Sequence, residues 1–89
     1  MTQAELLIKN QLGLHARACA LFVKTAAKYR SDVLVARDDL EVNGKSIMGV
    51  MMLAAAQGAE IEIRTLGAEE QDALDALTAL IADRFGESS

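Results

Sequence analysis

The sequence has no proline, no serine- or glycine-rich tract and no abrupt change of composition along its 89 residues. Linkers between domains are usually rich in such residues, so no position stands out as a domain boundary. We therefore expect residues 1–89 to form a single domain. A chain of this size buries only about 60% of the surface that its unfolded form exposes, so its core must come from well-patterned helices and strands.

Cysteine and histidine occur once each, as Cys19 and His15. A lone cysteine cannot form an internal disulfide, and the two residues together cannot complete a zinc site. We therefore expect no bound metal and no cofactor. Cys19 is interpreted as a small buried apolar residue.

Long apolar runs are also missing, since none approaches the roughly 20 residues that span a membrane. The segment Met1–Glu5 lacks the basic region and the apolar stretch of a signal peptide, which predicts a soluble cytoplasmic protein without membrane contacts. The net charge of −4 argues against a nucleic-acid partner, because phosphate backbones bind basic surfaces. Basic residues nevertheless gather in the first third of the chain, which predicts a local positive face for one anionic group or an acidic partner protein.

Apolar periodicity predicts four strands and three helices. In chain order these are a strand at 4–9, a helix at 16–29, strands at 33–36 and 40–42, a helix at 46–57, a strand at 60–64 and a helix that opens at Glu69 and closes at Arg84. This βαββαβα order predicts an α+β fold with its helices on one face of an antiparallel sheet and solvent on the other. Residues 87–89 are expected to be a frayed tail.

The first expected helix carries an apolar stripe on one face and its cations on the other. Leu21 lies among the cations, four residues after Arg17 and three before Lys24. We expect this leucine to be exposed within a basic surface.

His15 stands in a glycine-containing turn directly before this helix, and Arg17 is the second helical residue. The free N–H groups and the positive dipole at a helix start bind phosphate, and a guanidinium can bond phosphate oxygens in a fork. An imidazole is a competent nucleophile near neutral pH, and a positive environment favours its neutral form. His15 is therefore either a phosphoryl acceptor or simply a polar residue at a helix start, and the spacing alone does not decide.

Two segments resemble the signatures of the HPr family of phosphocarrier proteins. Residues 13–18, GLHARA, resemble the active-site signature, and residues 42–51, VNGKSIMGVM, resemble the second signature at the expected separation. The resemblance extends from about Leu6 to Phe85. It implies an open-faced β-sandwich of four antiparallel strands under three helices, which agrees with the order of elements above.

On this resemblance, enzyme I phosphorylates Nδ1 of His15 with phosphoenolpyruvate as the ultimate donor, and Arg17 stabilises the phosphate. The protein would be a monomeric carrier without turnover of its own, which passes the group to a sugar-specific or nitrogen-type soluble acceptor. Ala18 stands where the family usually has proline, so we expect a looser helix start but not a lost function. Ala18, Leu12 and the run at 51–56 resemble proteobacterial members, including the nitrogen-related branch.

Ser46 precedes the second expected helix, where its hydroxyl can cap a free backbone N–H. The resemblance adds a second role, because HPr kinase/phosphorylase phosphorylates this serine in many members of the family. The helix that follows is more apolar than so small a domain can bury, and exposed methionines adapt to several partners. The resemblance assigns five residues to partner docking: Leu21, Lys24, Ile47, Met48 and Met51.

Two alternatives to a phosphoryl carrier remain. The first is a regulatory binding module of the same fold, whose phosphorylation is sensed by other proteins and not used for sugar uptake. Intact His15 and Arg17 fit both functions. The second is a small-molecule-binding domain, which ranks last because the sequence shows no convergent set of polar pocket residues.

Overall fold

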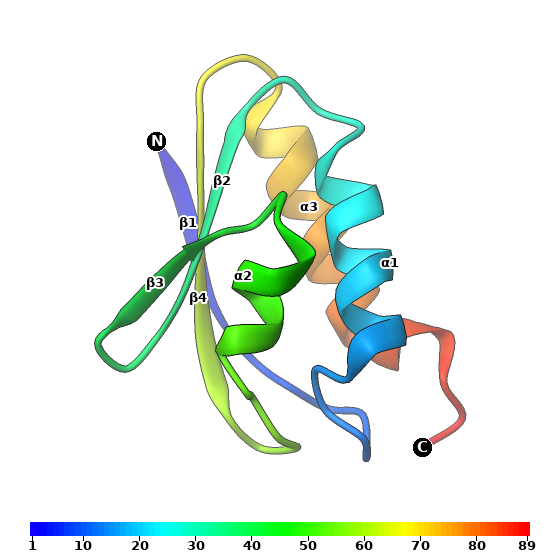
Figure 1. The fold of residues 1–89 in the computed structure, drawn as a ribbon. Helices are drawn as coiled ribbons and strands as arrows, with labels where there is room; N and C mark the ends of the chain where they lie inside the picture. The colour runs from blue at the N-terminus through cyan, green and yellow to red at the C-terminus, as the bar shows by residue number, and fades with distance from the viewer.

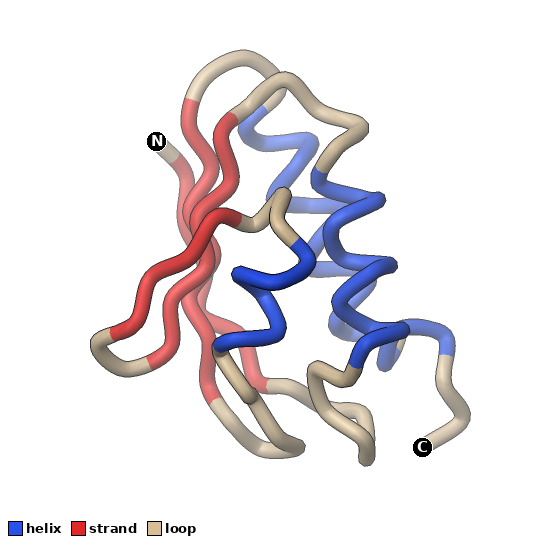
Figure 2. The backbone as a smooth tube through the Cα atoms, viewed as in Figure 1, coloured by secondary structure: helices blue, strands red, loops and turns tan.

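The computed structural model describes all 89 residues as a four-stranded sheet with three α-helices on one of its faces (Figures 1 and 2). The elements are β1 (Thr2–Leu7), α1 (Ala16–Ala26), β2 (Asp32–Arg37), β3 (Leu40–Asn43), α2 (Ile47–Met52), β4 (Glu60–Leu66), α3 (Glu70–Ala82) and the short 3-10 helix η1 (Arg84–Gly86). The predicted α+β class and βαββαβα order are confirmed.

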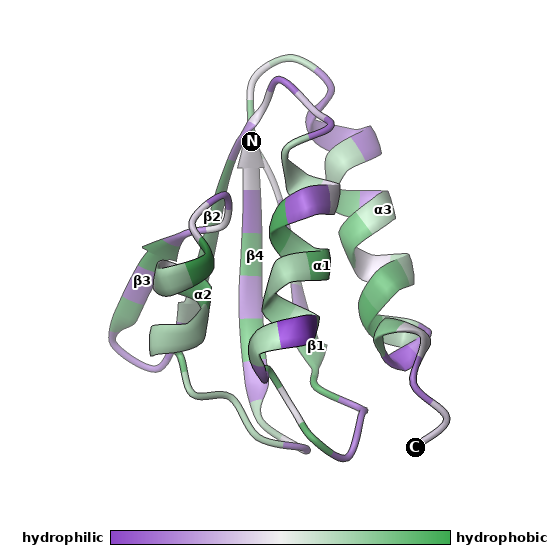
Figure 3. Ribbon diagram, turned by 45° about the vertical axis from the view of Figure 1, so that its right-hand side comes forward, coloured by the Kyte–Doolittle hydropathy of each residue, from purple (hydrophilic) through white to green (hydrophobic).

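The sheet has the strand order β1-β4-β2-β3, and every neighbouring pair is antiparallel. Successive residues of a strand point to opposite faces, so the alternating sequence of β4 gives one apolar and one polar face. Ile61, Ile63 and Thr65 are buried under the helices, while Glu60 is exposed on the open face. Figure 3 shows this alternation as bands of opposite hydropathy along β4.

The core is one cluster of 17 buried hydrophobic residues between the sheet and the helices. α1 contributes Phe22 and Cys19, both with no exposed surface, and α3 contributes an apolar stripe of Leu74, Leu77 and Ile81. Burial raises the pKa of the Cys19 thiol, because the thiolate loses its hydration there. The interpretation of Cys19 as a buried apolar residue is confirmed. No helix of the fold combines the length and the apolar character that a membrane crossing requires.

The boundaries of several elements differ from the predicted ones. α2 was expected at 46–57 but ends at Met52, because Ala54 adopts a left-handed conformation with φ of +48°. The side chain of Arg37 donates to the carbonyl oxygen of Leu53 at 3.0 Å, which satisfies one free carbonyl at this helix end. Glycine usually supplies a left-handed helix end, so the alanine gave no signal in the sequence.

β1 and α1 also have different ends from those expected. β1 covers Thr2–Leu7 and not 4–9, because Thr2 pairs with Thr65 at the far end of β4. α1 ends at Ala26 and not at Tyr29, because the amide of Tyr29 turns to the carbonyl of Ala26 in a tighter turn.

The C-terminal segment, expected to be frayed, is folded against the loop before α1. Arg84, Phe85 and Gly86 have positive φ values of 55°, 55° and 75°, which reverse the chain after α3. Phe85 is only 1% exposed and belongs to the core, and the amide of Gln11 donates to the carbonyl of Ser89 at 3.0 Å. The tail therefore runs back beside the start of α1 (Figure 1).

Candidate functional site

The loop between β1 and α1 presents His15 at the start of α1. Gly13 has φ of +66°, and a Cβ built there would lie 2.5 Å from the carbonyl oxygen of Ala55, so only glycine fits. The amide of Leu14 donates to that same carbonyl at 2.9 Å. The loop is thus pinned to the chain after α2, and this anchor fixes where His15 enters the helix.

His15 is the N-cap residue of α1, with extended backbone angles and no capping bond from its side chain. Its carbonyl oxygen accepts the first helical bond, from the amide of Cys19 at 2.9 Å. The amides of Ala16, Arg17 and Ala18 have no intrahelical acceptor, as in every helix start. The ring, 28% exposed, therefore stands beside free N–H groups that attract an anion.

The carboxylate of Glu87 contacts this ring. Nε2 of His15 lies 2.5 Å from Oε2 of Glu87, and Oε1 of Glu87 accepts from Nδ2 of Asn10 at 3.0 Å. No hydrogen bond within the chain engages Nδ1 of His15. The ring is therefore held through Nε2, and Nδ1 stays without a hydrogen bond.

Glu87 is held as a carboxylate at this position. Its hydrogen bonds to His15 and Asn10 are the largest influences that lower its pKa below the usual glutamate value, and the charges of His15 and Arg17 add to the effect. Partial burial opposes the shift without reversing it. The sequence predicts a positive environment for His15. The carboxylate of Glu87 partly offsets that positive charge.

Arg17 lies in the first turn of α1 with a side chain that is 64% exposed. Its NH1 atom is 3.7 Å from Oε2 of Glu87, which is an ion pair but too long for a hydrogen bond. The guanidinium donors are therefore free to bond phosphate oxygens. The structure brings the two predicted site residues, His15 and Arg17, to the same end of α1.

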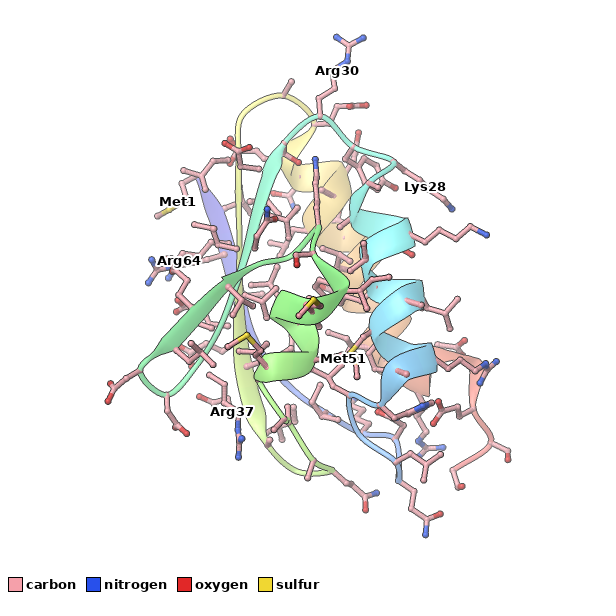
Figure 4. All side chains as sticks on the ribbon, viewed as in Figure 1. Met1, Lys28, Arg30, Arg37, Met51 and Arg64 are labelled. Atoms are coloured by element: carbon pink, nitrogen blue, oxygen red, sulfur yellow. The ribbon has the colours of Figure 1, made fainter.

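The expected positive face is spread out along α1. Lys24 lies in the last turn of the helix, at the opposite end from Arg17. Lys28 and Arg30 follow the helix and extend into solvent away from the start of α1 (Figure 4). Arg17 is thus the cation that lies at His15.

Ala18, in the place of the family's usual proline, is helical and fully buried in the core. Its methyl group packs the first turn of α1 onto the domain, although it lacks the fixed φ that proline would supply. The looser helix start stays a prediction.

Ser46 caps α2 as expected, since its Oγ accepts from the amide of Gly49 at 3.1 Å. The loop before it is fixed by Lys45, whose Nζ donates to the carbonyl of Tyr29 at 2.8 Å. The capping prediction is confirmed, and the regulatory role stays a prediction.

Several apolar residues of α2 are exposed, as expected, while Val50 is buried in the core. Ile47, Met48 and Met51 are 45%, 77% and 43% exposed. Met51 lies on the side of α2 that faces α1 (Figure 4). Leu21 does not fit the expectation of an exposed leucine, because it is half-buried and packs against the core.

The largest surface hollow lies on the open face of the sheet, away from His15. It has a volume of about 520 Å³, and acidic side chains such as Glu5, Glu41 and Glu62 dominate its lining. An acidic hollow repels a phosphate group, so it has no part in the chemistry at the start of α1.

Two residues of the site, Asn10 and Glu87, were not expected from the sequence. Asn10 is fully buried, and its Nδ2 also donates to the carbonyl of Gly13 at 2.8 Å. Glu87 follows a turn-forming glycine at the end of the chain, where charged residues are usually solvated. No local pattern in the sequence distinguishes either residue.

Comparison with known proteins agrees with this architecture. Residues 2–83 match the family model of the HPr component phosphorylation site of the phosphotransferase system (PTS). The phosphocarrier protein HPr of Neisseria meningitidis is 54% identical over 87 residues, which cover 98% of both chains.

Two solved structures extend the similarity to the fold. The crystal structure of HPr-C-His from Thermoanaerobacter tengcongensis has a TM-score of 0.96 and 45% identity, with complete coverage of both chains. An HPr dimer from the same organism has a TM-score of 0.79 and 46% identity, and covers 98% of this chain and all of that one. The chain therefore belongs to the HPr family, the phosphocarrier proteins of the PTS.

Proposed function

We propose that residues 1–89 are a single domain in which His15 accepts a phosphoryl group on Nδ1 and Arg17 stabilises it. The observation that carries this proposal is the position of His15: its ring stands at the start of α1 with Nδ1 unengaged, beside an exposed guanidinium. A single core cluster between the sheet and the helices supports one domain.

The transfer uses the lone pair of Nδ1. It forms a bond to phosphorus while the bond between phosphorus and the donor breaks, and the electron pair of that bond leaves with the donor. The phosphoryl oxygens then meet Arg17 and the free amides at the start of α1, which stabilise their charge. The acceptor protein takes the group by the same displacement, so the chain is restored and acts as a carrier without turnover of its own.

Enzyme I is the proposed donor, and a sugar-specific or nitrogen-type soluble component is the proposed acceptor. The docking surface that we assign to them consists of Ile47, Met48 and Met51 on α2 with Lys24 and the exposed part of Leu21 on α1. Exposed methionines suit several partners in turn, which a carrier must meet. We infer a monomer, because this surface and Nδ1 must both be open, and a cytoplasmic location, where phosphoenolpyruvate is made.

Ser46 is a proposed regulatory site for HPr kinase/phosphorylase. A phosphate on Ser46 would add about two negative charges beside Ile47 and Met48, within the docking surface. An acidic partner would then meet repulsion at this surface, and phosphorylation of His15 would slow.

The test is an incubation with phosphoenolpyruvate and each candidate enzyme I, followed by measurement of acid-labile phosphate. The unaltered chain should acquire such phosphate with its cognate enzyme I, and His15→Ala should acquire none while it melts as a folded domain. Because the ring of His15 lies at a helix start and is partly exposed, its loss should leave the core intact. Acid-labile phosphate on His15→Ala at the unaltered level would overturn the assignment.

A further inference from the structure

The contact between Glu87 and His15 is built from buried and fixed parts. The carboxylate of Glu87 is only 10% exposed, and its second oxygen is bound by the fully buried amide of Asn10. The same amide nitrogen holds the carbonyl of Gly13 at 2.8 Å. The ring, the carboxylate and the loop before α1 thus form one connected hydrogen-bonded unit.

The backbone that delivers Glu87 is strained. Arg84 and Phe85 both adopt left-handed angles, which side chains with a Cβ avoid. Such conformations persist only where the surroundings enforce them, and they cluster at functional sites. Here the buried ring of Phe85 fixes one side of the turn, and the bond between Gln11 and Ser89 fixes the tail beyond it.

We propose that Glu87 is a positioning residue for phosphoryl transfer, which orients the His15 ring through Nε2 and balances the positive charge that the ring gains when Nδ1 carries the phosphoryl group. This inference rests on His15 as the acceptor. A carboxylate that orients an imidazole through the nitrogen opposite the reacting one performs the same task in hydrolytic triads.

The charge balance follows from the bonds that change. When the lone pair of Nδ1 forms the bond to phosphorus, the donor keeps the electron pair of the bond that breaks, and the ring retains its proton on Nε2. The ring is then cationic, and Oε2 of Glu87 accepts from that N–H. When the acceptor removes the phosphoryl group, the electron pair returns to Nδ1 and the ring is neutral again.

Arg17 has a separate part in this arrangement. It is the other charged group at the ring, and its contact with Glu87 is loose at 3.7 Å. The guanidinium can therefore turn to the phosphoryl oxygens while Glu87 stays on Nε2. Arg17 thus stabilises the phosphoryl group, and Glu87 stabilises the cationic ring.

Three variants distinguish this positioning role from a purely structural one, in which Glu87 only holds the C-terminal segment against the domain. Glu87→Ala removes both the acceptor of the Nε2 proton and the charge. Glu87→Gln removes the charge and keeps one oxygen acceptor, for which the donors of His15 and Asn10 compete. Ser89→Ala is the matched control, because it removes the bond from Ser89 Oγ to Gln11 Oε1 and leaves the ring untouched. Melting curves verify that all three are folded.

Two measurements decide. The first is the proton NMR signal of the Nε2–H of His15, which should be protected from exchange in the unaltered chain and in Ser89→Ala, less protected in Glu87→Gln, and lost in Glu87→Ala. The second is the equilibrium between phosphorylated donor and carrier, which should shift about tenfold against the carrier in Glu87→Ala and Glu87→Gln, because a charge-assisted bond to the ring is lost. Ser89→Ala should leave this equilibrium unchanged.

The outcomes also separate this inference from the proposed function. An unchanged equilibrium in both Glu87 variants would overturn the positioning role alone, as would an equal shift in Ser89→Ala. Absence of phosphate on His15 in the unaltered chain would overturn both proposals, and the Nε2–H signal would then report a purely structural contact.

Discussion

Replacement of Gly13 by alanine tests how the loop before α1 places the ring of His15. Two costs follow from the structure. An alanine at φ of +66° carries a left-handed strain of about 1–2 kcal/mol. Its Cβ would also lie 2.5 Å from the oxygen of Ala55 and 2.9 Å from Cα of Ala56, and a forced backbone shift of this kind costs about 1–3 kcal/mol.

The lower entropy of the unfolded alanine chain returns about 0.4–1 kcal/mol, so Gly13→Ala should lower the free energy of unfolding by about 1–4.5 kcal/mol. Gly58→Ala is the control, because Gly58 also has a positive φ of +87° but nothing lies within 4 Å of a Cβ built there. Gly58→Ala should lower the free energy of unfolding by only about 1 kcal/mol. The difference between the two variants isolates the clash with the chain after α2.

Urea unfolding measures both stabilities, and phosphotransfer to His15 measures the consequence for the site. The carbonyl of Gly13 accepts from the amide of His15 at 3.0 Å and from Asn10, so a displaced Gly13 moves the ring and its support together. Gly13→Ala should therefore transfer more slowly even where it is fully folded. Equal stability of the two variants, with normal transfer by Gly13→Ala, would refute this account of the loop.

Three further predictions concern charges. Arg17→Ala should still accept phosphate on His15 but more slowly, by about tenfold or more, because each charge-assisted contact contributes about 1.5–3 kcal/mol; a transfer rate equal to that of the unaltered chain would remove Arg17 from the site. Ser46→Asp should melt at the same or a slightly higher temperature, since aspartate is also a good N-cap, yet accept phosphate severalfold more slowly; normal transfer would leave Ser46 with its capping role alone. The bonds to Thr2 and to the ammonium of Met1 lower the pKa of Glu70, so this group stabilises the fold above the usual glutamate pKa and loses that contribution as the pH falls through the lowered value. Glu70→Gln should therefore show a shallower loss of stability in acid than the unaltered chain, and parallel acid unfolding curves would contradict the linkage.

The sequence predicted the elements well where local patterns determine them. The alternation in β4 and the apolar stripe of α3 have strict periods, so their type and buried faces followed directly. The end of α2 could not be predicted in this way, because Ala54 adopts a left-handed φ that alanine rarely takes. Contacts with the rest of the fold stabilise this conformation, among them the hydrogen bond from Arg37 on β2 to the carbonyl of Leu53.

The site was predicted to a similar extent. His15, Arg17 and Ser46 lie within short motifs whose chemistry depends on helix starts, and helix starts are local features. Glu87 is separated from His15 by 72 residues in the sequence, and the turn that returns it uses left-handed residues other than glycine. A contact between distant residues that rests on strained backbone has no signature in a single sequence.

Because Cys19 is buried, the reactivity of its thiol can report local unfolding around α1. The thiol has no exposed surface, and its Sγ donates to the carbonyl of Leu14, the residue directly before His15, at 3.4 Å. A thiol reagent can reach it only when the core around α1 opens, so the rate of labelling at low denaturant reports the free energy of that opening. Labelling with and without a bound partner would then show, without any added probe, how much each partner rigidifies the segment that carries His15.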